Sequence, residues 1–69
     1  MYFELYDGEA FITFDIVYLN EKKMEVQLAV TNRGKISFVT YDLRESDKGM
    51  YFEYGCDYKQ IYINDFKED

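Results

Sequence analysis

The chain has 69 residues, a length that accommodates one domain and leaves little room for a second. Its 14 acidic residues outnumber its 8 basic residues, and the net charge of −6 disfavours direct nucleic-acid binding, which requires a basic surface. The sequence contains no histidine and a single cysteine, Cys56, so the commonest metal ligand and general base are missing and no internal disulfide can form.

The composition also bears on the compartment. No apolar run approaches the roughly 18 residues of a membrane-spanning helix, and no signal peptide precedes the first predicted strand. We therefore expect a cytoplasmic protein without membrane contact, in which the lone cysteine stays reduced. The 48% hydrophobic and 20% aromatic content, arranged periodically, predicts a folded chain despite the charge.

The first thirty residues alternate between apolar and polar side chains, which is typical of antiparallel strands. Asp7-Gly8 indicates a two-residue turn of type I′, which sets Phe3 opposite Ile12. A second turn at residues 19–23 sets the next pairing, and both turns direct one apolar face toward the core. The core-facing residues of this register are Phe3, Leu5, Ala10, Ile12, Phe14, Ile16, Tyr18, Met24, Val26, Leu28 and Val30.

Residues 32–34, Asn-Arg-Gly, indicate a three-residue hairpin loop with the glycine in the left-handed conformation. A loop of this length pairs Val30 with Ile36. Ile36 and Phe38 then extend the core face onto a fourth strand, which ends at Tyr41.

A final hairpin is expected within residues 50–63, and two registers are open to it. A two-residue turn at 56–57 aligns Phe52 with Ile61, whereas a three-residue loop would pair Glu53 with a lysine. We favour the first register, because burial of apolar side chains outweighs an exposed ion pair worth about 0–1 kcal/mol.

Together these segments predict an all-β fold, a small six-stranded antiparallel meander. Sheets twist, so we expect this one to curl into a half-barrel or a compact barrel. The domain should cover residues 1–63, residues 42–49 should form a loop, and the acidic tail at 64–69 should fray. The expected strands are residues 2–6, 10–18, 24–30, 35–41, 50–54 and 58–63.

The sequence offers no catalytic or metal-binding motif. C-x-x-C, H-E-x-x-H, G-x-G-x-x-G and G-x-S-x-G do not occur, and Ser37 and Ser46 have no histidine to activate them. No two carboxylates oppose each other in the expected register, and residues 42–49 do not follow the calcium-loop pattern. We therefore expect no enzymatic activity, no cofactor and no metal.

The face turned away from the core combines carboxylates with aromatic rings, and its mid-strand charges are negative. Tyrosine supplies a large contact area at low entropic cost, and carboxylates complement a basic surface. A solvated sheet face would give the same pattern, since tyrosine is a good strand former. The residues that we expect to bind a partner are Tyr2, Glu4, Tyr6, Phe11, Asp15, Glu25, Tyr41, Tyr51 and Glu53.

These observations predict a small acidic, non-enzymatic protein-interaction module whose partner is a protein with a basic surface. The most specific version is a phage-type inhibitor or adaptor that occupies the basic site of a nucleic-acid-handling protein, an analogy that rests on size, acidity and aromatic content. The carboxylates are too sparse to copy duplex DNA, which carries a charge about every 1.7 Å. The alternative is a structural homo-oligomer, in its simplest form a homodimer, assembled through the aromatic face and strand edges. A small-ligand module ranks lower, because a barrel of this size is filled by its own side chains.

Overall fold

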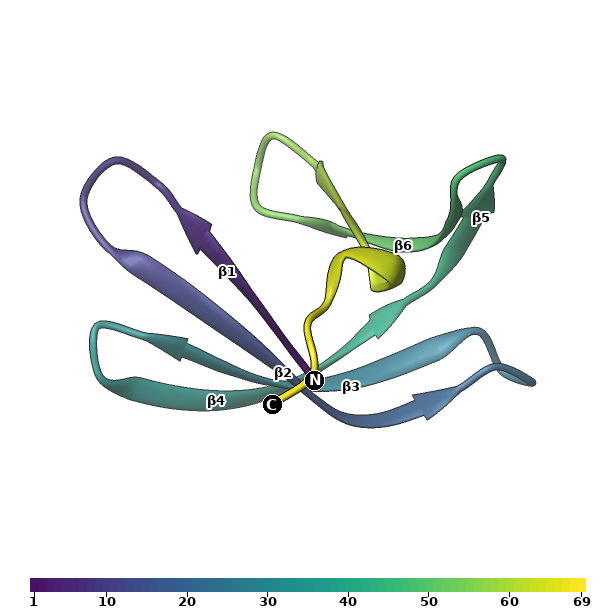
Figure 1. Cartoon of the computed structure of the whole chain (residues 1–69), viewed down its shortest axis with the longest axis horizontal. Coiled ribbons are helices and arrows are strands. Elements are labelled where there is room, and N and C mark those ends of the chain that lie inside the picture. Colours follow the sequence, from purple (N-terminus) through teal and green to yellow (C-terminus); the bar gives the residue numbers. More distant parts are fainter.

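The computed structural model describes all 69 residues, Met1–Asp69, as seven strands in two antiparallel sheets (Figure 1). The first sheet has the order β1-β2-β3-β4 and the second the order β5-β6-β7. The all-β antiparallel class is confirmed, but the strands number seven rather than six and do not close into a barrel. The elements are β1 Tyr2–Tyr6, β2 Phe11–Asn20, β3 Glu25–Asn32, β4 Lys35–Asp42, β5 Arg44–Ser46, β6 Gly49–Tyr54, β7 Lys59–Tyr62 and the 3-10 turn η1 Ile63–Asp65.

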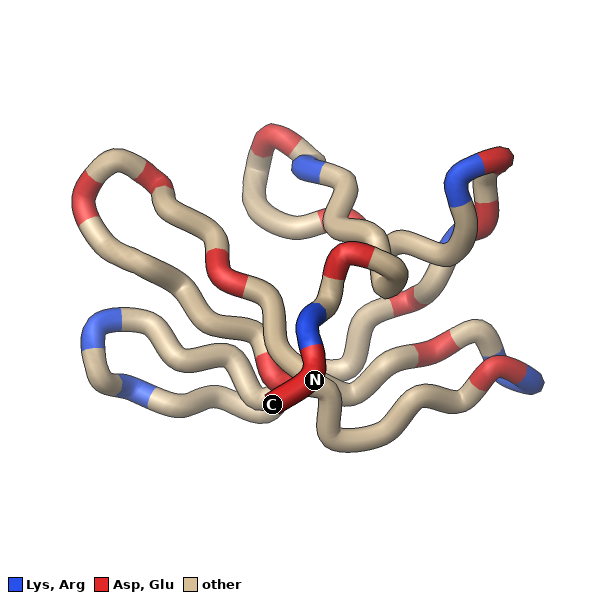
Figure 2. The backbone as a smooth tube through the Cα atoms, viewed as in Figure 1, with Lys and Arg blue, Asp and Glu red and all other residues tan.

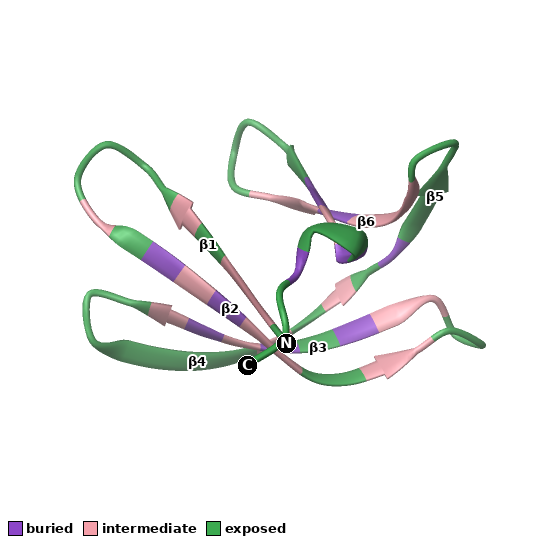
Figure 3. Cartoon of the chain, in the orientation of Figure 1, coloured by how far each residue is buried: buried purple, intermediate pink, exposed green.

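The core lies between the two sheets, where buried segments of β2 and β3 meet those of β6 (Figure 3). Phe14 is its centre: the side chain is 0% exposed, and its ring lies 5.8 Å from Phe52 and 5.0 Å from Tyr54 between centroids. Burying rings of this size supplies much of the apolar area that so short a chain can remove from water. The ten buried residues are Ile12, Phe14, Val26, Leu28, Val30, Leu43, Phe52, Ile61, Ile63 and Phe66.

The β1–β2 hairpin closes through a four-residue loop rather than the two-residue turn that we expected. The Asp7 carboxylate accepts hydrogen bonds from the backbone N–H groups of Glu9 and Ala10, both at 3.0 Å, which favours the wider loop. Phe3 consequently pairs with Phe14. The register moves by two residues, and an even shift leaves every side chain on its expected face.

The β2–β3 hairpin also differs by two residues, so that Ile16 pairs with Leu28. A β-bulge follows at Val17, where one extra residue enters β2. The bulge reverses the facing of the strand beyond it. Tyr18, which we expected in the core, is 61% exposed, and Leu19 packs against the core instead.

The β3–β4 hairpin differs from the prediction in a way that reverses the facing of a whole strand. Arg33 and Gly34 have φ values of +53° and +80°, the signature of a two-residue type I′ turn. This loop is one residue shorter than expected, and an odd shift turns all of β4 over. Ile36 and Phe38, expected in the core, are therefore exposed, while Tyr41 faces inward. The pattern did not decide the facing, because β4 carries apolar side chains at both alternations.

The expected loop at residues 42–49 contains the short strand β5, which pairs with β6. An ion pair between Arg44 Nε and Glu53 Oε1 at 3.0 Å joins the two strands. The register that we favoured for the last hairpin is confirmed, since Phe52 pairs with Ile61 and both are buried.

The tail at residues 64–69, which we expected to fray, is docked. Phe66 is 7% exposed, and its ring lies 5.6 Å from that of Phe3. Tyr2 and Lys67 exchange two backbone hydrogen bonds of 2.8 and 2.7 Å, so the tail runs beside β1. One aromatic side chain outweighs the acidic composition of the segment.

Candidate interaction surface

The outward side of the β1–β2 hairpin carries an exposed aromatic pair. Tyr6 and Phe11 are paired across the strands, with ring centroids 5.0 Å apart and the rings tilted by 46°. Phe11 is 63% exposed and Tyr6 nearly as much. The Tyr6 hydroxyl donates a hydrogen bond of 3.0 Å to the Gly8 carbonyl, which fixes the ring at the hairpin tip. Two rings held in this way form a preorganised apolar contact.

The same hairpin is wholly acidic. Residues 1–20 include four carboxylates and no lysine or arginine, and only acidic segments mark this hairpin in Figure 2. Tyr2 pairs with Asp15, and Glu4 lies on the same side of the sheet. We call the set formed by Tyr2, Glu4, Tyr6, Phe11 and Asp15 the acidic hairpin face. All five are residues that the sequence predicted for partner binding.

Asp7 sits at the tip of this hairpin. The backbone N–H groups of Ala10 and Glu9 donate to its carboxylate and hold its pKa below the usual value of 3.8. The charge at the tip is therefore retained under mildly acidic conditions.

The carboxylates of the hairpin differ in how they are compensated. Glu9 forms an ion pair with Arg33 of the β3–β4 turn, at an exposed position where such a pair is weak. Glu4 and Asp15 belong to none of the three salt bridges in the chain. Their charges are available to a cationic partner.

Tyr41, predicted for partner binding, faces inward. Its ring stacks on Phe52 at 4.9 Å with an angle of 27° between the planes. Burial, with a smaller contribution from Tyr54, raises the pKa of the Tyr41 phenol above its usual value of 10.0. The prediction placed it outward because the β3–β4 loop was taken as one residue too long.

Three other predicted residues lie away from the acidic hairpin face. Tyr51 and Glu53 are on β6 in the second sheet, where Tyr51 lies 5.1 Å from Tyr62 and Glu53 is ion-paired. Glu25 is on the first sheet but at the start of β3, beside Asp42. The structure thus brings five of the nine residues together.

The sequence missed the outward side chains of β4. Phe38 is 69% exposed and Ile36 nearly as much. Phe38 pairs with Ala29, which in turn pairs with Asp15, so one cross-strand row runs from β1 to β4 over the outward face. A two-residue turn at 33–34 exposes these side chains, but the apolar pattern of β4 fits either facing.

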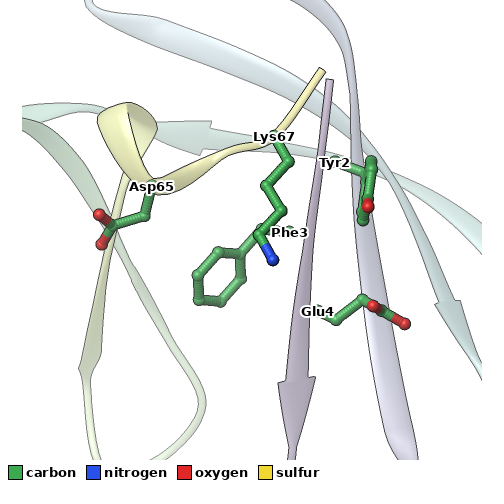
Figure 4. Close-up of a pocket in the computed structure, with 5 residues that line it drawn as sticks. All are labelled: Tyr2, Phe3, Glu4, Asp65 and Lys67. Atoms are coloured by element: carbon green, nitrogen blue, oxygen red, sulfur yellow. The ribbon is translucent and has the colours of Figure 1, made fainter. Parts of the chain in front are cut away.

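A small depression adjoins the acidic hairpin face at Tyr2 and Glu4. Figure 4 shows this depression where the docked tail runs beside β1, a space of about 190 Å³ with Phe3 on one side of the strand and Tyr2 and Glu4 on the other. Two carboxylates, the Lys67 ammonium and the Tyr2 side chain line it, and its lining includes no serine, threonine or cysteine. No three histidine, cysteine or acidic side chains in the chain lie close enough to hold a metal ion.

No family model, no curated protein and no solved structure matches this chain. The structure also contains no helix that is long and apolar enough to cross a membrane.

Proposed function

We propose that this protein is a non-enzymatic interaction module that binds a protein with a basic surface through the acidic hairpin face. The observation that carries the proposal is the exposed Tyr6–Phe11 pair on a hairpin whose only charges are negative. Exposed aromatic anchors beside carboxylates that have no salt-bridge partner are typical of the centre and rim of protein interfaces.

The geometry favours a protein partner over a small ligand. The acidic hairpin face is an open sheet surface, on which Glu4 and Asp15 stand beside the rings on neighbouring strands. Residues fixed in a sheet lose little freedom on binding, so the contact energy is not spent on ordering them. Lysine or arginine side chains of the partner would pair with the two free carboxylates, while its apolar groups cover the rings.

The specific form that we propose is a phage-type inhibitor or adaptor that occupies the basic site of a nucleic-acid-handling protein. The carboxylates are much sparser than the phosphates of a duplex, which are spaced about 1.7 Å apart along its axis. Affinity would therefore come mainly from the rings, and the charges would orient the complex and speed its formation. A partner bound in this way is blocked from its nucleic acid.

The test is a tagged pull-down from lysate with and without nuclease, followed by affinity measurements on the captured protein. We expect one stoichiometric partner that survives nuclease. Tyr6→Ala and Phe11→Ala should each weaken its binding about tenfold or more. The matched control is Tyr62→Ala, which removes a tyrosine ring from the second sheet and should leave the affinity unchanged.

The charges are tested separately with Glu4→Gln and Asp15→Asn. Both variants should slow association and flatten the dependence of the association rate on salt. Capture of no protein, or equal losses in Tyr62→Ala and Phe11→Ala, would contradict the proposed site. A partner that continues to bind nucleic acid while bound would contradict the inhibitor form alone.

A further inference from the structure

The two sheets have four edge strands, β1, β4, β5 and β7, and three of them are protected against pairing with another strand. Edges are normally protected by a cover, by charge or by shortness. The tail covers β1 at Tyr2, and Glu4 places a charge in the middle of that strand. β5 has three residues, and β7 has four and includes Lys59.

β4 lacks all of these protections. It has eight residues, and its charges stand only at its ends, at Lys35 and Asp42. Its pairing with β3 contains no bulge, and its other side has no strand neighbour. Ile36 and Phe38 add two large exposed apolar side chains beside the open edge. This combination is the one that invites another strand.

The free backbone groups of β4 follow from its turn. In a two-residue hairpin the closing residues, here Asn32 and Lys35, exchange both hydrogen bonds, and every second pair repeats this pattern. Ile36, Phe38 and Thr40 therefore direct their N–H and C=O groups away from β3. None of the backbone hydrogen bonds outside the strands involves these residues.

We propose that this edge pairs with β4 of a second copy of the chain, antiparallel about a two-fold axis through Phe38. Phe38 then pairs with the partner's Phe38, and Ile36 pairs with the partner's Thr40, so all three free residues exchange backbone hydrogen bonds. A two-fold axis perpendicular to the sheet keeps the outward sides on one face. The two exposed Phe38 rings meet there, and the four-stranded first sheets of the two copies join into one sheet of eight strands.

The charge distribution identifies a second copy as the occupant. Arg33 and Lys35 mark the beginning of β4, and Asp42, beside Glu25, marks its end, as the opposite colours at the two ends in Figure 2 show. Antiparallel pairing about a two-fold axis brings each positive end next to the negative end of the partner. The strand is thus complementary to itself, which an unrelated strand has no reason to match.

This inference does not depend on the proposed basic partner. The acidic hairpin face lies at the other edge of the first sheet, with β3 between β2 and β4. Both copies of that face would point to the same side of the eight-stranded sheet. The dimer would therefore present two equivalent binding sites.

The first test is sedimentation of the purified chain from low micromolar to near-millimolar concentration. We expect twice the 8.4 kDa monomer mass at the upper end. Phe38→Lys should raise the dimer dissociation constant about tenfold or more. The matched control is Tyr18→Lys, which places the same charge on a similarly exposed aromatic position of β2 and should leave the dimer intact. A chain that stays monomeric throughout, or a dimer that both variants weaken equally, would overturn the proposal.

Amide hydrogen exchange identifies the edge directly. The N–H groups of Ile36, Phe38 and Thr40 should become protected as concentration rises, while that of Glu4 on β1 should not. Lys35→Glu should weaken the dimer, and Asp42→Lys in the same chain should restore it. Protection confined to β1, or β4 amides protected only when a foreign protein is added, would show that a second copy does not occupy this edge.

Discussion

The two faces of the first sheet contain the same kinds of side chain and differ in what covers them. Phe14 and Phe11 lie three positions apart on β2, yet Phe14 is 0% exposed and Phe11 is 63% exposed. The inward face packs against β6 and the docked tail, whereas the outward face has no second layer. Aromatic content alone does not distinguish a core from an exposed face, because the covering layer decides which one it becomes.

The faces also differ in charge. No polar or charged residue is among the ten buried ones, while the outward face carries Glu4 and Asp15 without ion-pair partners. The inward face therefore needs only apolar contact. Under the proposed function, a partner of the outward face would have to supply cations as well as apolar surface.

The sharpest way to break this comparison is to truncate one ring on each face. Phe14→Ala should cost about 3–5 kcal/mol of unfolding free energy, since it leaves a cavity among Phe52 and Tyr54. Because so small a domain has modest stability, a loss of that size would unfold a large fraction of the molecules. Phe11→Ala should cost less than about 1 kcal/mol, because its ring is mostly in water. Urea denaturation of both variants measures the difference, and equal losses would mean that the faces are assigned wrongly.

Releasing the docked tail, which covers part of the inward face, gives the next largest effect. Phe66→Ala should cost about 3 kcal/mol, near the lower end of the range for buried phenylalanine. It should also speed hydrogen exchange at the N–H groups of Tyr2 and Lys67, because the tail would lose its anchor. Phe66→Leu is the control and should keep most of that protection. Unchanged exchange in Phe66→Ala would show that backbone pairing holds the tail without the ring.

The smallest effect concerns a polar atom at the margin of the inward face. The Tyr41 phenol has a raised pKa in the folded chain, so folding favours its neutral form. The resulting contribution to the free energy of unfolding is complete below pH 10.0 and is lost as the pH rises through the higher pKa of the folded state. In an absorbance titration of the eight tyrosines, Tyr41 should therefore ionise above the ordinary range. Tyr41→Phe should remove this late step and flatten the alkaline loss of stability. A late step that persists in Tyr41→Phe would assign it to another tyrosine.

The facing of the side chains in β1 to β3, up to the bulge, could be predicted because the register errors there were even numbers of residues. Two loops each moved the register by two residues, and Ile12, Phe14 and Leu28 remained buried. The one-residue events at Val17 and at the β3–β4 turn could not be predicted from the pattern. Bulges and turn types differ by small free energies, and β4 is apolar on both alternations.

The last segments depended on contacts that the sequence does not display locally. β5 is held by backbone pairing to β6 rather than by an apolar pattern of its own. The tail is held by Phe66 against rings from distant parts of the chain. For the candidate site, five neighbouring residues were predicted because they lie on one hairpin. Tyr41 was misplaced with β4, and Tyr51 and Glu53 belong to a sheet whose separation from the first was not predictable.

The pairing of Tyr2 with Lys67 has a consequence for the connectivity of the chain. The Met1 amino nitrogen lies 3.3 Å from Asp69 Oδ2, and Figure 1 shows the two ends side by side. A short linker between them would give a covalent ring without disturbing either sheet. New ends opened in the exposed turn at residues 21–23 would yield a circular permutant with the same strand neighbours. The covalent ring, with its ends joined and no new ends opened, has fewer unfolded conformations than the open chain. Closing it should therefore stabilise the fold through entropy alone.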